Sequence, residues 1–293
     1  MFENKQDKQL VPMLSILAMA LLLTASLIAI RSDDGGRPYV FTSPRGEQVD
    51  IYGGEGLYRF DNTYKAIGVR SFDWLSLVVV APLFVLGIYL YRHGHFRGQL
   101  LLAAGFTYLA YIYALAVMGN AFNGLFLVWI ALITVGLFGL SLTVERIDIT
   151  SLPDKLATNF PRKLLSLYVI ALGAILLFQY VGEVITAYST GNPPASLDHY
   201  TTLELAALEL SIMVPLHLVG GILLWKKRPL GYLISIILAF AAAMVFIALS
   251  LSLLLFQYNF GQGKVLDTVI TTFIALVACG ISLVVFRRVK NEP

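Results

Sequence analysis

The stretch from Pro193 to Tyr232 reads PPASLDHYTTLELAALELSIMVPLHLVGGILLWKKRPLGY. Its central part is mostly apolar over about 20 residues, the length that an α-helix needs to cross the hydrocarbon core of a bilayer. Acidic residues lie near one end of this apolar part, a histidine lies inside it, and a short basic loop follows it. The stretch therefore predicts a membrane-spanning helix with a polar site towards one membrane face.

The composition of the whole chain also indicates a membrane protein. Of its 293 residues, 58% are hydrophobic and 13% are charged, and the mean hydropathy is +0.77. Soluble domains carry about 25% charged residues, so a soluble fold of this size would leave much apolar surface in water. The net charge is only +3, and the basic residues lie at predicted helix ends, so we expect no nucleic-acid partner. The single cysteine, Cys279, excludes a disulfide within the chain.

Eight segments are long and apolar enough to span a bilayer. They cover about 10–30, 74–91, 99–118, 122–144, 164–187, 203–225, 230–257 and 265–286. We therefore predict an all-α integral membrane protein with five regions. They are the first transmembrane helix (1–30), an extracytoplasmic cap loop (31–73), helices two to four (74–146), a cytoplasmic linker (147–163) and helices five to eight (164–290). The first apolar segment is longer than the core of a signal peptide, so we expect an uncleaved anchor.

The distribution of lysine and arginine predicts the orientation of the chain. With the N-terminus in the cytoplasm, 14 of the 21 basic residues fall on the inner side. They are Lys5, Lys8, Arg92, Arg97, Arg146, Lys155, Arg162, Lys163, Lys226, Lys227, Arg228, Arg287, Arg288 and Lys290. The expected location is a bacterial-type cytoplasmic (inner) membrane, with both termini cytoplasmic.

The 31–73 loop is expected to form a small folded cap on the outer face. Residues 37–52, RPYVFTSPRGEQVDIY, predict a β-hairpin because apolar residues alternate around the turn sequence Ser-Pro-Arg-Gly at 43–46. From Asp61, a candidate N-cap, the sequence predicts a short helix on the membrane surface. Asp73 would then cap the second transmembrane helix.

A shared pattern indicates that the chain is an internal duplication of four plus four helices. At a shift of 133 residues, the pattern Pro82, Gly87, Gly98 aligns with Pro215, Gly220, Gly231. Residues 139–146, GLSLTVER, also agree with residues 280–287, GISLVVFR, at five of eight positions. Parallel repeats of this kind occur in transporters, where the substrate site lies between the halves.

Carboxyl groups inside apolar segments are the main candidates for a functional site. Glu183 and Glu209 lie within predicted spans, and Glu204 lies at the start of one. A carboxylate in the membrane is costly unless it is protonated, hydrated or paired, and no lysine or arginine falls inside a predicted span. We expect these glutamates to bind a small solute, a proton or a cation. The alternative is a hydrated carboxyl or a helix–helix hydrogen bond.

Other polar residues are expected at the same outer level and would complete a polar pocket open to the outside. They are Asn120 and Asn123 in the turn GNAFNG, Gln179 and Tyr180 one turn before Glu183, and Tyr108, Tyr111 and Tyr113 in the third span. For any one tyrosine, ordinary packing or an interfacial belt is the alternative.

Pro215 and His217 lie deeper in the sixth span. The proline removes one backbone hydrogen bond, so it is a candidate hinge. A proton route from Glu209 towards His217 is one interpretation of the histidine, and a hydrogen-bonded packing residue is the other.

We predict no catalytic residue, no metal ligand and no cofactor. The sequence carries no catalytic or nucleotide-binding motif in a suitable context, and one intramembrane histidine cannot make a bis-histidine haem site. Asp198, His199 and Glu204 form only a weak candidate for a metal site.

Two long runs carry a resemblance to known proteins. They are GEGLYRFDNTYKAIGVRSFDWLSLVVVAPLFVLGIYLYRHGHFRGQLLLAAGF, residues 54–106, and GNPPASLDHYTTLELAALELSIMVPLHLVGGILLWKKRPLGY, residues 191–232. Both resemble a family of uncharacterised bacterial multi-pass membrane proteins. The resemblance covers most of the chain and implies a membrane fold, but no activity, ligand or site residue.

The leading functional prediction is a transporter or permease for a small solute or ion. Glu183 and Glu209 would bind a proton or cation, Pro215 would act as a hinge, and the outer cap would act as a lid. One alternative is a non-catalytic sensor or assembly partner that uses the cap. Another is a membrane-embedded enzyme that acts on a lipid or quinone, although an enzyme is the less expected outcome. The lipid bilayer is the expected environment, and homo-oligomerisation stays open.

Overall fold

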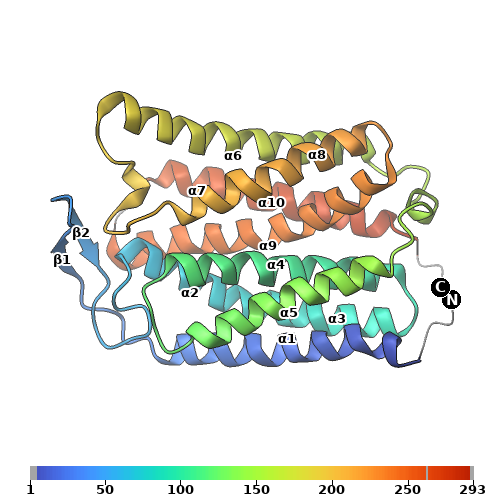
Figure 1. Ribbon diagram of the computed structural model, residues 1–293, viewed down its shortest axis with the longest axis horizontal. Coiled ribbons are helices and arrows are strands. Elements are labelled where there is room, and N and C mark those ends of the chain that lie inside the picture. The colour runs from blue at the N-terminus through green and yellow to red at the C-terminus, as the bar shows by residue number, and fades with distance from the viewer. Residues whose placement is uncertain (1–4, 262, 291–293) are drawn as a thin grey trace.

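The computed structural model describes residues 5–261 and 263–290. Over this part of the chain, eight helices are long and apolar enough to cross a membrane, which is consistent with a multi-pass membrane protein. The helices lie alongside one another in one bundle (Figure 1), with a small two-stranded sheet at one end. We call this end the cap face, and the opposite end, where α1 starts and α10 finishes, the terminal face.

In chain order, the first half contains α1 (Lys5–Arg31), β1 (Tyr39–Thr42), β2 (Gln48–Ile51), α2 (Thr63–Leu75), the π-helical segment η1 (Ser76–Val80), α3 (Ala81–Arg92), α4 (Phe96–Gly119) and α5 (Phe126–Glu145). After the 3₁₀ segment η2 (Leu152–Lys155), the second half contains α6 (Arg162–Thr190), the 3₁₀ segment η3 (Ala195–Leu197), α7 (Glu204–Leu208), the π-helical segment η4 (Glu209–Met213), α8 (Val214–Trp225), α9 (Pro229–Phe260) and α10 (Val265–Arg288). The segments α2–η1–α3 and α7–η4–α8 each form one continuous span.

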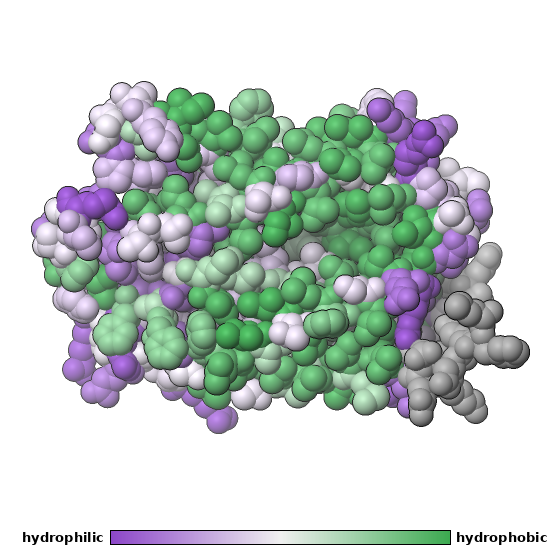
Figure 2. Space-filling model, in the orientation of Figure 1, coloured by the Kyte–Doolittle hydropathy of each residue, from purple (hydrophilic) through white to green (hydrophobic). Residues whose placement is uncertain are grey.

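The surface of the bundle matches a membrane environment. On the face shown in Figure 2, hydrophobic side chains cover the middle of the bundle and hydrophilic side chains gather at its two ends. Large apolar side chains such as Phe178, Leu127 and Leu276 are exposed on the helices. Exposed apolar side chains of this kind are stable in lipid and unstable in water.

The centre of the bundle is formed by α4 and α9. In the most apolar window of each described span, 72% of the residues of α9 and 56% of those of α4 are buried, against at most 39% elsewhere. The two helices pack against each other, and the small residues Ala103, Ala104 and Ala239 are buried in them. Small residues allow helix backbones to approach closely inside a membrane, where lipid tails remove the usual hydrophobic driving force.

The two halves pack in corresponding ways. In the first half α1 packs on α3, α3 on α4, and α4 on α5; in the second half α6 packs on α8, α8 on α9, and α9 on α10. The π-helical segments η1 and η4 begin at Ser76 and Glu209, which are 133 residues apart, and each ends two residues before a proline. This is the shift at which the two sequences align.

The aligned glycines also occupy equivalent positions. A Cβ atom on Gly98 would lie 2.3 Å from the backbone nitrogen of Tyr91, and a Cβ atom on Gly231 would lie 2.2 Å from that of Leu224. Both helix starts therefore need glycine for the same close approach to the preceding helix. These matches favour the duplication, which stays a prediction.

The cap contains the predicted β-hairpin. Strand β1 pairs antiparallel with β2, with Tyr39 opposite Ile51 and Thr42 opposite Gln48. In the turn, the Ser43 hydroxyl donates to the Glu47 carboxylate at 2.6 Å and accepts from the backbone N–H of Arg45 and Glu47. Gly46 has a φ angle of +91°, which a residue with a side chain adopts with difficulty.

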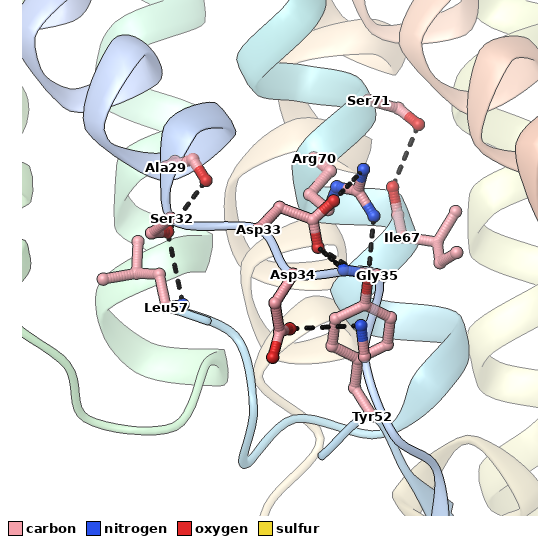
Figure 3. A network of polar contacts seen from close by, with 11 residues as sticks. Ala29, Ser32, Asp33, Asp34, Gly35, Tyr52, Leu57, Ile67, Arg70 and Ser71 are labelled. Atoms are coloured by element: carbon pink, nitrogen blue, oxygen red, sulfur yellow. Dashed lines mark hydrogen bonds and ion pairs between the residues drawn. The ribbon is translucent and has the colours of Figure 1, made fainter. Parts of the chain in front are cut away.

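A polar network fixes the base of the cap to the bundle (Figure 3). Arg70 of α2 forms an ion pair with Asp33, which follows α1, and donates to the Tyr52 hydroxyl at 2.9 Å. The Tyr52 hydroxyl donates in turn to Asp33 at 2.7 Å. Burial and the neighbouring Asp33 carboxylate raise the pKa of Tyr52 above its ordinary value, so the hydroxyl keeps its proton and remains a donor.

The predictions for residues 61–75 were wrong in two respects. The N-cap of α2 is Asn62, not Asp61, and its side chain accepts from the backbone N–H of Lys65 at 2.7 Å. The helix does not lie separately on the membrane surface; it continues through η1 into α3 as one span, Thr63–Arg92. Asp73 consequently caps nothing, since it is buried inside the helix and accepts from the Tyr58 hydroxyl at 2.7 Å.

The second span begins earlier than predicted because the charged residues of α2 form ion pairs or hydrogen bonds with other parts of the fold. Lys65, Arg70 and Asp73 look like the end of an apolar segment in the sequence. In the fold, each side chain meets a polar group of the cap or of another helix. Lys65 and Arg70 belong to the second span, Thr63–Arg92. The prediction that no lysine or arginine lies inside a span is therefore wrong.

Candidate functional site: a cavity between the two halves

A cavity of about 480 Å³ lies between the two halves of the bundle. Its walls come from α2 and α4 of the first half and from α6, α7, η4, α8, α9 and α10 of the second. In the first half α1 packs against α5, whereas the corresponding pair α6 and α10 barely touch. Both α6 and α10 line the cavity, so it occupies space that closer packing of these two helices would fill.

The cavity wall is mostly apolar and carries a few polar groups. These polar groups belong to Tyr64, Thr107, Tyr108, Tyr111, Gln179, Tyr180, Glu209, His217 and Thr271. Among the described residues that line it, Glu209 is the one carboxyl, and none is a lysine or an arginine. An apolar wall with a small number of polar groups is the usual composition of a site for a small organic molecule.

The Glu209 carboxyl is buried and only half satisfied. The side chain is 7% exposed, and its Oε1 accepts a hydrogen bond from the Tyr111 hydroxyl of α4. Its Oε2 is buried without a hydrogen-bond partner among the described groups. A buried carboxylate without a partner costs several kcal/mol, so the group must carry a proton or meet a cation or donor that enters the cavity.

The local backbone explains how Glu209 comes to face the cavity. It is the first residue of η4, and the N–H of Val214 donates to its carbonyl five residues back instead of four. Pro215, two residues after η4, has no N–H and its ring excludes a regular helical contact with the preceding turn. The wider π-helical turn accommodates the proline ring and the missing N–H. Such segments occur frequently at functional sites.

The structure brings several other predicted residues to the same cavity. Tyr111 is bonded to Glu209, Gln179 and Tyr180 of α6 form part of the wall, and His217 lies on α8 at one turn beyond η4. The His217 Nδ1 donates to the Met213 carbonyl at 2.7 Å, which leaves Nε2 as the remaining polar atom of the ring. Glu209 and His217 thus share one cavity.

Glu204 lies outside the cavity and has its own partner. Its carboxylate pairs with the Lys65 ammonium at 2.5 Å, and the same ammonium also donates to the Gly119 carbonyl and lies 3.9 Å from the centre of the Tyr200 ring. This pair joins α2 to α7 across the two halves. The sequence missed it because Lys65 was assigned to a surface helix.

Asp61 extends this contact at the cap face. Its Oδ1 accepts from the backbone N–H of Ala121 at 2.8 Å and from the Tyr200 hydroxyl at 2.9 Å. Burial raises the pKa of Asp61 to about 6, although these two hydrogen bonds act in the opposite direction. We call Asp61, Lys65, Tyr200 and Glu204 the cap-face latch, because they hold the two halves together above the cavity.

The remaining candidates lie elsewhere at the cap face. Glu183 accepts from the backbone N–H and hydroxyl of Ser196, and the Asn123 side chain accepts from the N–H of Leu125 at the start of α5. Asn120 is the C-cap residue of α4. None of these three residues lines the cavity.

The three residues considered for a metal site point to different partners. The Asp198 carboxylate accepts from the Asn62 side chain at 2.7 Å, and the His199 ring packs edge-on against Phe41. Glu204 is engaged by Lys65. Within residues 5–261 and 263–290, no group of three or more His, Cys, Asp or Glu side chains is placed to hold a metal ion.

A second buried polar cluster lies in the first half and was missed in the sequence. Asp73 is bonded to Tyr58, and the Ser76 hydroxyl lies 3.2 Å from the Tyr108 hydroxyl of α4. Ser76 begins η1 as Glu209 begins η4. Each half therefore carries a buried carboxyl within one turn of its π-helical segment, and in each half a tyrosine hydroxyl donates to that carboxyl.

Comparison of the chain with protein-family models, with curated proteins and with solved structures finds no match. The cavity and the residues around it are therefore the main indication of function.

Proposed function

We propose that the protein binds a small amphiphilic solute in the cavity between its halves and moves it across the membrane. The observation that carries this proposal is the Glu209 carboxyl: among the described residues its Oε2 has no partner, and the apolar cavity beside it has no lysine or arginine in its wall. A solute with an apolar body and one cationic or hydrogen-bond-donating group complements such a site. When the solute leaves, a proton would take its place on the carboxyl.

The dimensions of the site support a small organic molecule over a bare ion. A volume of about 480 Å³ falls within the range of ligand pockets, roughly 300–1,000 Å³. A bare metal ion would need several oxygen ligands, and the cavity offers a single carboxyl. The apolar wall formed by residues such as Leu172, Ile175 and Leu238 suits hydrocarbon or aromatic groups.

Two features support transport over binding alone. First, the site lies between two halves that match at corresponding positions, and both halves interrupt the same helix with a π-helical segment and a proline. Transporters with internal repeats commonly place their site between the repeats, next to interrupted helices. Second, the cap-face latch is made of contacts between the halves that can open and close, as alternating access requires.

The first test is binding of tetraphenylphosphonium, a lipophilic cation, to the purified protein. Glu209→Gln keeps the shape of the side chain and its hydrogen bond to Tyr111 but removes the negative charge. We expect this variant to bind the cation at least about tenfold more weakly, since an opposite charge in a low-dielectric site contributes more than 1.4 kcal/mol. Glu183→Gln is the matched control, because Glu183 carries the same group at the cap end outside the cavity.

Proteoliposomes then separate transport from binding. A pH gradient should drive tetraphenylphosphonium flux in the wild type and in Glu183→Gln, and little flux in Glu209→Gln. Equal binding by the wild type and Glu209→Gln would overturn the assignment of the site. Binding without flux would favour the sensor alternative, for which the folded cap is the supporting feature.

A further inference from the structure

A second cavity, of about 710 Å³, lies at the terminal face between α1, α3, α4 and the end of α5. Its polar lining includes Arg92 and Tyr91 of α3, His95 before α4, and Arg146 after α5. Gln9 of α1 and Gln99 of α4 add amide groups. Among the described lining residues none is acidic, so the chamber, which we call the basic pocket, carries positive charge.

The two arginines of the basic pocket differ from Arg97 and Arg162 at the same face. Arg97 donates to the backbone carbonyls of Val289 and Arg287, and Arg162 donates to those of Leu224 and Trp225, so both serve to cap helix ends. Arg92 makes no hydrogen bond or ion pair with the described residues.

Among the residues that the structure describes, Arg146 donates only to the Tyr91 hydroxyl, at 2.8 Å. A guanidinium group has five N–H donors, so most of the donors of both arginines have no partner among the described residues. The basic residues of a membrane protein commonly mark topology alone, but topology needs no pocket that gathers them around a buried imidazole nitrogen.

His95 is an independent indication of a ligand. Its Nδ1 is buried and has no hydrogen-bond partner among the described groups. His95 is also the N-cap residue of α4, a helix that runs for 24 residues from Phe96. The positive end of a long helix and an unpartnered imidazole nitrogen beside two guanidinium groups favour an anion with several acceptor oxygens.

We propose that the basic pocket binds a phosphate group, most directly that of an anionic lipid headgroup. Its position fits a lipid, because its lining residues lie at the terminal-face ends of helices that are long and apolar enough to span a membrane. Pro12 and Met13 of α1 form an apolar side of the pocket, and Met13 is 60% exposed towards the surroundings of the helix. A free phosphate would use the same donors without the apolar side.

The test is lipid binding to the delipidated full chain, measured by native mass spectrometry. Phosphatidylglycerol is the anionic probe and phosphatidylcholine the zwitterionic comparison. We expect preferential retention of phosphatidylglycerol, with about a fivefold loss of affinity for each arginine removed in Arg92→Gln and Arg146→Gln, the size expected for one basic residue at an anionic membrane surface. Arg228→Gln, an exposed arginine at the same face and outside the pocket, should leave retention unchanged.

Binding of inorganic phosphate alone distinguishes a lipid headgroup from a free phosphate as the source of the bound phosphate group. If it binds to the wild type and Arg92→Gln weakens it, while phosphatidylglycerol shows no preference, the ligand is a free phosphate and the pocket assignment stands. Equal retention of both lipids together with no arginine-dependent phosphate binding would overturn the proposal. Arg92→Gln is decisive should Arg146→Gln fail to fold, because Arg92 makes no polar contact with the described residues. The measurement does not depend on the proposed transport function.

Discussion

At the scale of single residues, the acidic side chains near the cap face differ in what lies opposite them. Glu204 meets the Lys65 ammonium, Glu183 meets the backbone N–H and hydroxyl of Ser196, and Asp73 meets the Tyr58 hydroxyl. Only in Glu209 is one oxygen both unpartnered and beside a cavity large enough for a ligand. Asp61 Oδ2 is also buried without a partner among the described groups, so it is the cavity beside the unpartnered oxygen that distinguishes Glu209.

Asp61 gives a prediction about pH. Its pKa in the folded protein is raised to about 6, and in an unfolded chain an aspartate titrates near its ordinary value, about 3.9. The folded state therefore holds the proton more tightly, and Asp61 stabilises it fully below about pH 4. This contribution, about 3 kcal/mol at most, is lost as the pH rises through about 6.

The measurement is the thermal unfolding midpoint of the wild type and Asp61→Asn from pH 4.5 to 8. Asparagine keeps an oxygen that accepts from Ala121 and Tyr200 but does not titrate. We expect the stability of the variant relative to the wild type to increase up to about pH 7 and then level off. The comparison is needed because the pKa of Asp198 is also raised and that of His199 is lowered by burial. A constant difference between the two proteins would contradict the prediction.

At the scale of elements, each half contains one helix that is interrupted by a π-helical segment and a proline, and the proposed transport depends on this interruption. In both α2–η1–α3 and α7–η4–α8, the π-helical segment precedes a proline by two residues. The proline removes a backbone donor, and the π-helical segment changes the direction in which the residues before it face. The hinge that we propose would lie at that point, between the cap-side and terminal-side parts of each span.

Pro215→Ala tests whether this interruption matters for transport. Alanine restores the N–H and removes the ring, so we expect a more regular helix that resists bending. Flux of tetraphenylphosphonium should fall several-fold in proteoliposomes, while its binding to the purified protein changes little, because Glu209 is kept. Pro82→Ala is the matched variant in the first half, where no lining residue of the cavity belongs to η1. Unchanged flux in Pro215→Ala would argue against a hinge there.

At the scale of the whole molecule, the cavity results from unequal packing of two similar halves. The outer helices of the first half, α1 and α5, close against each other, and the corresponding α6 and α10 do not. A cavity of about 480 Å³ accordingly lies beside Glu209 of the second half. The proposed site therefore has walls from both halves.

Filling the cavity gives a prediction at this scale. Ala242 of α9 lines the cavity and is half-buried. Phenylalanine at this position would occupy part of the volume, so we expect Ala242→Phe to abolish tetraphenylphosphonium binding while the Glu209 carboxyl remains. Thermal unfolding should show stability close to that of the wild type, since an apolar side chain enters an apolar space. Ala278 of α10 is buried and lies outside the cavity. The control variant Ala278→Phe should therefore destabilise the protein by overpacking.

The sequence alone predicted the membrane-spanning helices, the hairpin and one carboxyl of the candidate site. Apolar runs of membrane-spanning length predicted the eight helices, and the alternating pattern around residues 43–46 predicted the hairpin, because both depend on local spacing along the chain. Glu209 could be chosen as a candidate because a carboxyl inside an apolar run is visible as such. These features need no knowledge of which helices become neighbours.

Only the tertiary structure decided which polar residues meet. Lys65 and Glu204 are far apart in the chain, and so are Tyr111 and Glu209, yet each pair is in contact. Whether a charged residue ends a span or lies inside one depends on such partners, which is why the sequence misplaced the start of the second helix. The cavity likewise exists because α6 and α10 stay apart, a consequence of packing among several helices that no pattern within one helix records.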